Sequence, residues 1–306
     1  MHNVEKTISD IKSLKIQGAR NIAKIALENL LFVSQESKNR TIKAFVKELE
    51  RTSVALSSSR PTEPMMRNIL EEAVCFARTD DSEDVEELKK AFAKHVRFRL
   101  MEIEKGAKKL AEYGARIIPD GGVVLTHCHS STTTSILIEA KKMKKKFSVV
   151  SFETRPRYQG RITASELARA GIDVTATVDG AMNLFMKKAD IVIVGADAIT
   201  SRGDLINKIG TSTLAHIAKM NDVSFYSAAE LYKYNPMTIF GTREEIEERD
   251  SKEVWEAPPK KVKIRNPAFE ATAAKYINGY ITELGVIPPQ SFFTLASEKL
   301  GIKLYK

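Results

Sequence analysis

Cys128 stands where a short apolar run gives way to polar residues and then to a stretch typical of a helix. The run Val123–Leu125 has the character of a buried strand, and Thr126-His127-Cys128-His129-Ser130 follows it directly. In α/β proteins the carboxyl ends of parallel strands meet the N-termini of the following helices, and ligands bind at that edge. Helix N-termini and nearby imidazoles lower the pKa of cysteine, so we expect a thiol that ionises easily. The alternative is a small cysteine that simply ends a strand.

A second polar position of the same kind follows another apolar run. Ile191–Val194 is β-branched throughout, and Gly195-Ala196-Asp197 comes next. One strand end then offers a thiol and another a carboxylate, groups that can act as base or nucleophile and as acid. The alternative for Asp197 is a structural aspartate that caps the following turn.

Three arginines follow the apolar run Phe147–Phe152. They are Arg155, Arg157 and Arg161, and proline and glycine stand among them. The guanidinium fork of arginine matches phosphate oxygens in pairs, so this cluster suits a phosphate site better than a salt-bridged surface.

Two more polar clusters complete the series. Asn207 and Lys208 precede the helix expected from residue 211, and its backbone amides could hold a second anion together with Lys208. Asp179-Gly180 follows the strand expected at 174–178. Polar clusters at successive strand ends predict a ligand site on that one edge of the sheet.

Composition and charge narrow the classes of function. The formal net charge of +9 leaves nucleic acid, phosphorylated metabolites and plain solubility open, but the basic run Lys141–Lys146 closes an expected helix, where cations are favoured. Cys75 and Cys128 give no disulfide framework, and no long apolar segment is present, so we expect an intracellular protein without a membrane span. His127 and His129 lack a third ligand at metal-binding spacing, so we expect a metal-free thiol.

The elements that position these residues change character along the chain. Up to about residue 115, apolar residues recur at three and four positions, which predicts amphipathic helices. Beyond that point short apolar runs alternate with helical stretches, which predicts an α/β fold with a mostly parallel sheet. We expect a helical domain over 1–115 and a sheet domain over 116–306. The strands are expected at 123–125, 147–152, 174–178, 191–194, 223–226 and 280–282, and the helices between them at 131–143, 162–170, 180–187 and 210–220.

The order of these motifs resembles that of the initiation-factor-2B/isomerase superfamily, over about residues 8–306. The resemblance is nearest to its archaeal ribose-1,5-bisphosphate isomerase branch. It implies a helical domain followed by a Rossmann-like domain, assembled as a homo-oligomer, either a dimer through the C-terminal domains or a hexamer. The segments that carry it are Thr126-His127-Cys128-His129-Ser130, Glu153-Thr154-Arg155-Pro156, Gly195-Ala196-Asp197-Ala198-Ile199, Asn207-Lys208-Ile209-Gly210-Thr211, Ala228-Ala229-Glu230-Leu231-Tyr232-Lys233-Tyr234 and Asn266-Pro267-Ala268-Phe269-Glu270.

The resemblance also implies roles for residues. Cys128 and Asp197 match the catalytic pair of an isomerase that converts α-D-ribose 1,5-bisphosphate into ribulose 1,5-bisphosphate in nucleoside monophosphate degradation. The isomerases carry Arg-Gly-Ala at a phosphate site where this chain has Gln17-Gly18-Ala19. The residues implied to bind substrate are Gln17, Gly18, Ala19, Arg20, Arg60, Arg155, Asn207 and Lys208.

The same resemblance sets expectations for partners. A sugar bisphosphate is the expected substrate and AMP a candidate activator, in a cytoplasmic enzyme that engages neither membrane nor nucleic acid. No metal or redox cofactor is expected, because an aldose–ketose shift moves only protons. The alternative is a regulatory initiation-factor subunit that binds nucleotide or sugar phosphate without catalysis. Gln17 favours this alternative, but it leaves Cys128 without a task.

Overall fold

The computed structural model describes residues 3–242, 244 and 246–301. The chain divides into two compact units: Ala107–Lys299 forms one, and the described residues before Ala107, with Leu300 and Gly301, form the other. Among the described residues, no helix is both long and apolar enough to span a membrane.

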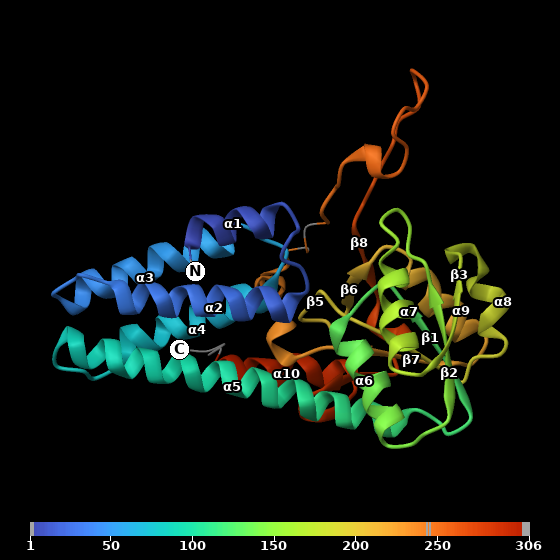
Figure 1. Cartoon of the computed structure of the whole chain (residues 1–306), viewed down its shortest axis with the longest axis horizontal. Coiled ribbons are helices and arrows are strands. Elements are labelled where there is room, and N and C mark those ends of the chain that lie inside the picture. Colours follow the sequence, from blue (N-terminus) through green and yellow to red (C-terminus); the bar gives the residue numbers. More distant parts are fainter. Residues whose placement is uncertain (1–2, 243, 245, 302–306) are drawn as a thin grey trace. The chain divides into compact units, whose positions relative to one another are not determined.

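The first unit consists of helices, and its described residues contain no strand (Figure 1). Ile22, Ala26 and Leu30 lie on one face of the second helix and are fully buried, as their spacing predicts. Thr41 begins the third helix by accepting a hydrogen bond from Ala44 N (3.3 Å), a typical N-cap. The helices are α1 (Val4–Lys12), α2 (Ala19–Glu36), α3 (Ile42–Ser57), α4 (Pro64–Thr79) and α5 (Val85–Ile117), the last of which continues into the second unit.

The second unit is built on a seven-stranded sheet of order β10-β9-β7-β4-β1-β2-β3. All neighbouring strands pair in parallel except β10, which is antiparallel to β9. The mostly parallel α/β sheet that the sequence predicts is therefore confirmed. The strands are β1 (Gly122–His127), β2 (Phe147–Phe152), β3 (Asp173–Thr177), β4 (Ile191–Val194), β7 (Ser224–Ala228), β9 (Gly279–Thr282) and β10 (Gly285–Ile287).

Helices cover this sheet and close its core (Figure 1). Apolar side chains of β1 and β2 pack with the first of these helices, as in the fully buried Val124, Ile136 and Val149. The helices are α6 (Ser131–Lys142), α7 (Gln159–Arg169), α8 (Met182–Met186), α9 (Thr211–Met220) and α10 (Pro289–Leu300), with short 3-10 turns at η1 (Asp179–Ala181), η2 (Leu231–Lys233), η3 (Pro236–Phe240), η4 (Ser251–Glu253) and η5 (Ala274–Tyr276).

The direction of strand order reverses at β1. The chain moves from β1 through β2 to β3 on one side, whereas β4 and β7 add on the other side of β1. Because such connections are right-handed, the helices after β1 and β2 cover one face and those leading to β4 and β7 cover the other. A reversal of this kind opens a crevice outside the carboxyl ends of the two strands that flank it, here β1 and β4.

A small antiparallel sheet, which the sequence did not predict, lies in the same unit. It consists of β5 (Ala198–Ile199), β6 (Leu205–Lys208) and β8 (Phe269–Thr272), with β6 in the centre. Several boundaries also differ from expectation by a few residues. For example, β3 begins and ends one residue early, and α7 begins at Gln159, before the helical periodicity becomes evident.

Candidate active site

Cys128 and Asp197 follow the two strands that flank the crevice. β1 ends at His127 and β4 at Val194, and the two strands are parallel neighbours. Ser130 and Gly195 bring the two strand ends together, because a Cβ added to Gly195 would lie 2.6 Å from Ser130 Cβ. The topology therefore brings together the two residues expected to carry the chemistry.

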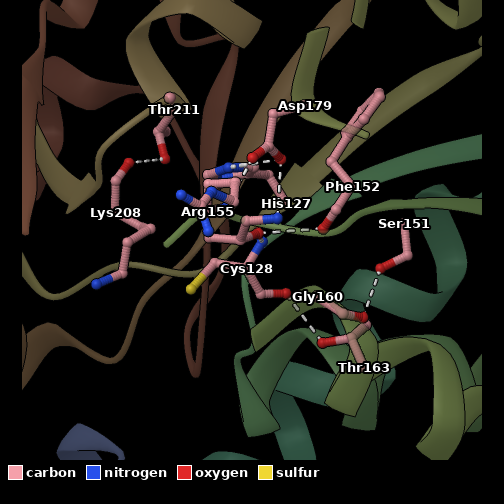
Figure 2. Close-up of polar contacts among 12 residues, drawn as sticks. His127, Cys128, Ser151, Phe152, Arg155, Gly160, Thr163, Asp179, Lys208 and Thr211 are labelled. Atoms are coloured by element: carbon pink, nitrogen blue, oxygen red, sulfur yellow. Dashed lines mark hydrogen bonds and ion pairs between the residues drawn. The ribbon is translucent and has the colours of Figure 1, made fainter. Parts of the chain in front are cut away.

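The backbone of Cys128 is held on both sides. Its N–H donates to Thr154 Oγ1 (2.8 Å), and its carbonyl accepts from Thr163 Oγ1 (2.9 Å). Cys128 has a φ of 67°, in the left-handed region that non-glycine residues seldom occupy. In Figure 2 the sulfur lies on the side of this loop that faces Lys208, and the carbonyl faces Thr163.

The Cys128 thiol is harder to ionise than an ordinary cysteine. Burial raises its pKa from 9.0 to about 11, although the residue as a whole is partly exposed, and the charges of Asp197 and Asp179 act in the same direction. Lys208 opposes them and lowers the pKa. The expectation of an easily formed thiolate is therefore wrong, because desolvation outweighs the nearby cation.

Lys208 ends β6 and brings the positive charge to the thiol. Its ammonium lies 4.6 Å from the centre of the Phe269 ring on β8, so the pairing of β6 with β8 directs this side chain. Asn207, its neighbour on β6, is buried and donates to Thr211 Oγ1 (3.0 Å). Both residues thus lie on a strand.

Two backbone amides at the start of α9, those of Gly210 and Ser212, are already occupied. Glu270 Oε1 accepts from Gly210 N (2.6 Å) and Ser212 N (2.9 Å), so this carboxylate caps the helix. The expectation that these amides are open to an anion is wrong, because a carboxylate from the small sheet takes the position that a phosphate would need.

The three arginines after β2 also depart from expectation. Arg157 pairs with Glu253 (2.9 Å) and Arg161 pairs with Glu153 (2.9 Å). Arg155 donates to the Tyr158 hydroxyl (2.8 Å) and to a backbone carbonyl, that of Val254 (3.0 Å). Two of the three are therefore salt-bridged, and only Arg155 lacks a carboxylate partner among the described residues.

His127 is neutral and buried beside the thiol. Burial lowers its pKa from 6.5 to about 4; Asp179 opposes this shift, with Oδ1 3.8 Å from the imidazole Nε2, and Lys208 reinforces it. Its Nδ1 has no hydrogen-bond partner among the described residues, and its ring packs against Gly210, whose added Cβ would lie 3.0 Å from Nε2. A neutral imidazole supplies no charge, so His127 does not help the thiol to ionise.

The remaining expected binding residues lie in the helical unit. Gln17 is exposed and donates from Nε2 to Leu14 O (2.6 Å), Gly18 is the N-cap of α2 with a φ of 84°, and α2 begins at Ala19, followed by Arg20. Arg60 lies between α3 and α4, and its buried Nε has no hydrogen-bond partner within the described chain. That unpaired donor is compatible with an anion ligand. The substrate contacts of these residues stay a prediction.

Among the described residues, no group of three or more His, Cys, Asp or Glu side chains is arranged to hold a metal ion. The profile of the Initiation factor 2 subunit family matches residues 15–289. The chain belongs to this family. Over nearly its whole length the chain is also similar to a ribose 1,5-bisphosphate isomerase from Archaeoglobus fulgidus, which is 39% identical over 303 residues, covering 98% of this chain and 95% of the relative.

Two further relatives, one known from its sequence and one from a solved structure, are similar to this chain over nearly its whole length. A ribose 1,5-bisphosphate isomerase from Pyrococcus furiosus is 40% identical over 299 residues, covering 95% of this chain and 92% of the relative. A solved structure from Pyrococcus horikoshii OT3, described as translation initiation factor eIF-2B, matches with a TM-score of 0.78 and 33% identity, covering 94% of this chain and 97% of that one.

The contacts of several residues in this unit were not predicted from the sequence. Thr154 and Thr163 contact the backbone of Cys128, and Glu270 caps α9. Glu230 and Lys233 form a buried ion pair after β7 (3.0 Å), and Glu230 also accepts from Thr132 in the first turn of α6 (3.3 Å). The motif that contains Glu230 and Lys233 is visible in the sequence, and charged residues within an apolar context are the signal that could have found them.

Proposed function

We propose that this protein is an aldose–ketose isomerase that converts α-D-ribose 1,5-bisphosphate into ribulose 1,5-bisphosphate. The observation that carries the proposal is the presence of both Cys128 and Asp197 at the crevice between β1 and β4, with Lys208 close enough to act on the thiol. The names of the two archaeal relatives support the choice of substrate.

The reaction needs proton transfers at both carbon and oxygen. The anomeric oxygen carries phosphate, so the ring cannot open by simply freeing an aldehyde. Because the resting thiol is protonated, Cys128 gives its proton to the ring oxygen as the bond from that oxygen to C1 breaks. The thiolate so formed removes the proton from C2, which leaves a double bond between C1 and C2.

The second half returns a proton to carbon. The Asp197 carboxylate takes the proton of the C2 hydroxyl, a ketone forms at C2, and C1 receives the proton held by Cys128. Asp197 then passes its proton back to Cys128, which restores both groups. All bonds and charges balance without a redox partner. Lys208 stabilises the thiolate each time Cys128 has given up its proton, which is consistent with its effect on the thiol pKa.

Binding of the two phosphate groups is assigned to positive and amide side chains. One phosphate is assigned to Lys208, Asn207 and Arg155, which lie in the unit that holds the thiol. The Arg155 guanidinium has no carboxylate partner in the described chain. The unpaired Nε of Arg60 and the segment from Gln17 to Arg20 are proposed for the second phosphate. Resemblance to the family further supports a cytoplasmic homodimer or hexamer with AMP as activator, which light scattering and an assay with added AMP would test.

The function is tested by incubating the purified protein with ribose 1,5-bisphosphate and measuring ribulose 1,5-bisphosphate. Cys128→Ser and Asp197→Asn should each lower kcat by at least about a hundredfold, since each removes a proton carrier. Cys75→Ser, at an exposed cysteine on α4, is the matched control and should keep full activity. Full activity in both site variants would refute the assigned roles, and no product with the wild type would refute the substrate.

A second candidate function is a regulatory subunit that binds an initiation factor. The relative described as translation initiation factor eIF-2B, and Gln17 in place of a phosphate-binding arginine, favour it. A pull-down with initiation factor 2 that succeeds, with an inactive wild-type protein in the isomerase assay, would favour this function over the first.

A further inference from the structure

The backbone of Cys128 adopts a conformation that its own flanking elements do not explain. A φ of 67° is sparsely populated for a residue with a Cβ, and such a conformation persists only where the surroundings hold it. β1 ends at His127, one residue before Cys128, and α6 begins at Ser131. The hydrogen bonds that hold Cys128 come instead from the next βα segment.

We propose that Thr154 and Thr163 are positioning residues that hold Cys128 through its backbone. Thr154 lies in the loop between β2 and α7 and accepts the Cys128 N–H (2.8 Å). Thr163 lies in α7 and donates to the Cys128 carbonyl (2.9 Å). The two hydroxyls fix the peptide groups on either side of the Cys128 Cα, and this sets the direction of the Cα–Cβ bond and of the thiol (Figure 2).

The protons of the two hydroxyls are fully committed to this arrangement. Thr154 donates its one proton to Phe152 O (3.1 Å), so toward Cys128 it can only accept. Thr163 donates its proton to Cys128 O, so at the contact with His129 Nδ1 (3.1 Å) it can only accept, and His129 carries the proton on Nδ1. Thr154 therefore acts as an acceptor and Thr163 as a donor toward Cys128. Serine keeps the hydroxyl that these bonds need, and valine does not.

Burial prevents water from taking over these roles. Thr154 is 0% exposed and Thr163 is 1% exposed. A buried amide or carbonyl that loses its partner stays unsatisfied when water cannot reach it. Loss of either hydroxyl should therefore release Cys128 from its left-handed conformation.

Asp179 fixes Thr154 in turn. Thr154 has a φ of 64°, a rare value for a β-branched residue. Asp179 accepts the backbone N–H of Thr154 at Oδ1 (2.8 Å) and that of Arg155 at Oδ2 (2.7 Å). The Asp179 carboxylate, in the turn that follows β3, thus holds the loop that holds the thiol.

The test uses Thr154→Val and Thr163→Val, with serine at each position as the rescue. Both are made in a Cys75→Ser background, so that a small disulfide reagent modifies only Cys128. The valine variants should lower kcat about tenfold with KM within about twofold, because they move the thiol and leave the substrate contacts in place. They should also speed modification of Cys128 by at least about threefold, because a released thiol is less buried.

The controls separate positioning from stability. The serine variants should keep both values within about threefold of wild type, since the hydroxyl remains. Thr175→Val, at an exposed position on β3, should change neither. If a valine variant does not fold, alanine at the same position removes the hydroxyl without placing a methyl group against the backbone, and the same values are measured.

Two outcomes would overturn the inference. One is a folded valine or alanine variant with the wild-type kcat and modification rate. The other is a serine variant that loses as much kcat as valine, which would show that packing and not the hydroxyl matters. Only the kcat comparison rests on the proposed function: with an inactive wild type the modification rates still decide the positioning role.

Discussion

The reactivity of the Cys128 thiol should depend on burial and on two nearby charges that act in opposite directions. Its pKa is raised from 9.0 to about 11, chiefly by burial, while Lys208 lowers it and Asp197 raises it. A thiol with a pKa of about 11 is ionised in roughly one molecule in a thousand at pH 8, against about one in ten for a pKa of 9. Replacing Lys208 and replacing Asp197 should therefore change the reactivity of Cys128 in opposite directions.

The expected size of the effect combines two opposing terms. The thiolate fraction at pH 8 falls about a hundredfold, but a thiolate of higher pKa is the better nucleophile toward disulfides, by roughly threefold for each unit of thiol pKa. The net result is that Cys128 should react roughly tenfold more slowly than a thiol of pKa 9 before access is considered. Its rate should keep rising with pH through pH 10, since only about half of the thiol is ionised at pH 11.

The assay follows a small disulfide reagent on the Cys75→Ser protein between pH 7 and pH 11. Lys208→Met keeps the chain length beside the Phe269 ring and removes the charge, so it should shift the curve of rate against pH to higher pH. Asp197→Asn should shift the curve to lower pH. A rate that levels off below pH 9, or a Lys208→Met variant that reacts at lower pH, would refute the reasoning that burial dominates and that Lys208 opposes it.

Three more predictions concern stability and binding. The low pKa of His127 stabilises the folded protein above the ordinary pKa of 6.5. As pH falls toward 4 the unfolded state gains the proton first, and the free energy of unfolding drops by up to about 3 kcal/mol. His127→Asn should reduce the loss of stability between pH 7 and pH 5 in urea titrations, and an unchanged loss would contradict the prediction. Gly160→Ala should cost about 2–4 kcal/mol in the same titrations, because an added Cβ would lie 1.7 Å from Phe152 O, whereas Gly180→Ala, with no atom within 4 Å, should be nearly neutral. Gln17→Arg should tighten sugar-bisphosphate binding by one to two powers of ten in calorimetric titration, since it adds a charge-assisted contact to phosphate; unchanged affinity would show that this segment does not bind phosphate.

The parts of the fold that the sequence predicts are those that depend on local composition. β2 and β4 match their expected ranges residue for residue because both are short apolar runs. The same strands predicted the edge of the sheet at which the candidate site lies, since the carboxyl ends of parallel strands share one edge. β6 escaped because it contains Asn207 and Lys208 and is defined by pairing with β8, some sixty residues later in the chain.

The electrostatics of the site were predicted less well, for a related reason. The proposal that Arg157 and Arg161 bind phosphate failed because their carboxylate partners, Glu253 and Glu153, cannot be paired from spacing alone. Likewise, nothing local to Gly210 indicates that Glu270 will cap α9 from the small sheet. Charge type is visible in a sequence, but the partner that neutralises it is a property of the fold.

The protonation state of the thiol shows how the same residues can support a different mechanism. An easily formed thiolate, as the sequence suggested, would act only as a base. A buried thiol that keeps its proton can first donate to the ring oxygen and then, as a thiolate, remove the proton from carbon. In the mechanism that we propose, burial keeps on Cys128 the proton that the thiol donates first, and Lys208 limits how far burial can raise the pKa. We therefore propose that Lys208, which lies on a strand that the sequence did not predict, makes the raised pKa compatible with catalysis.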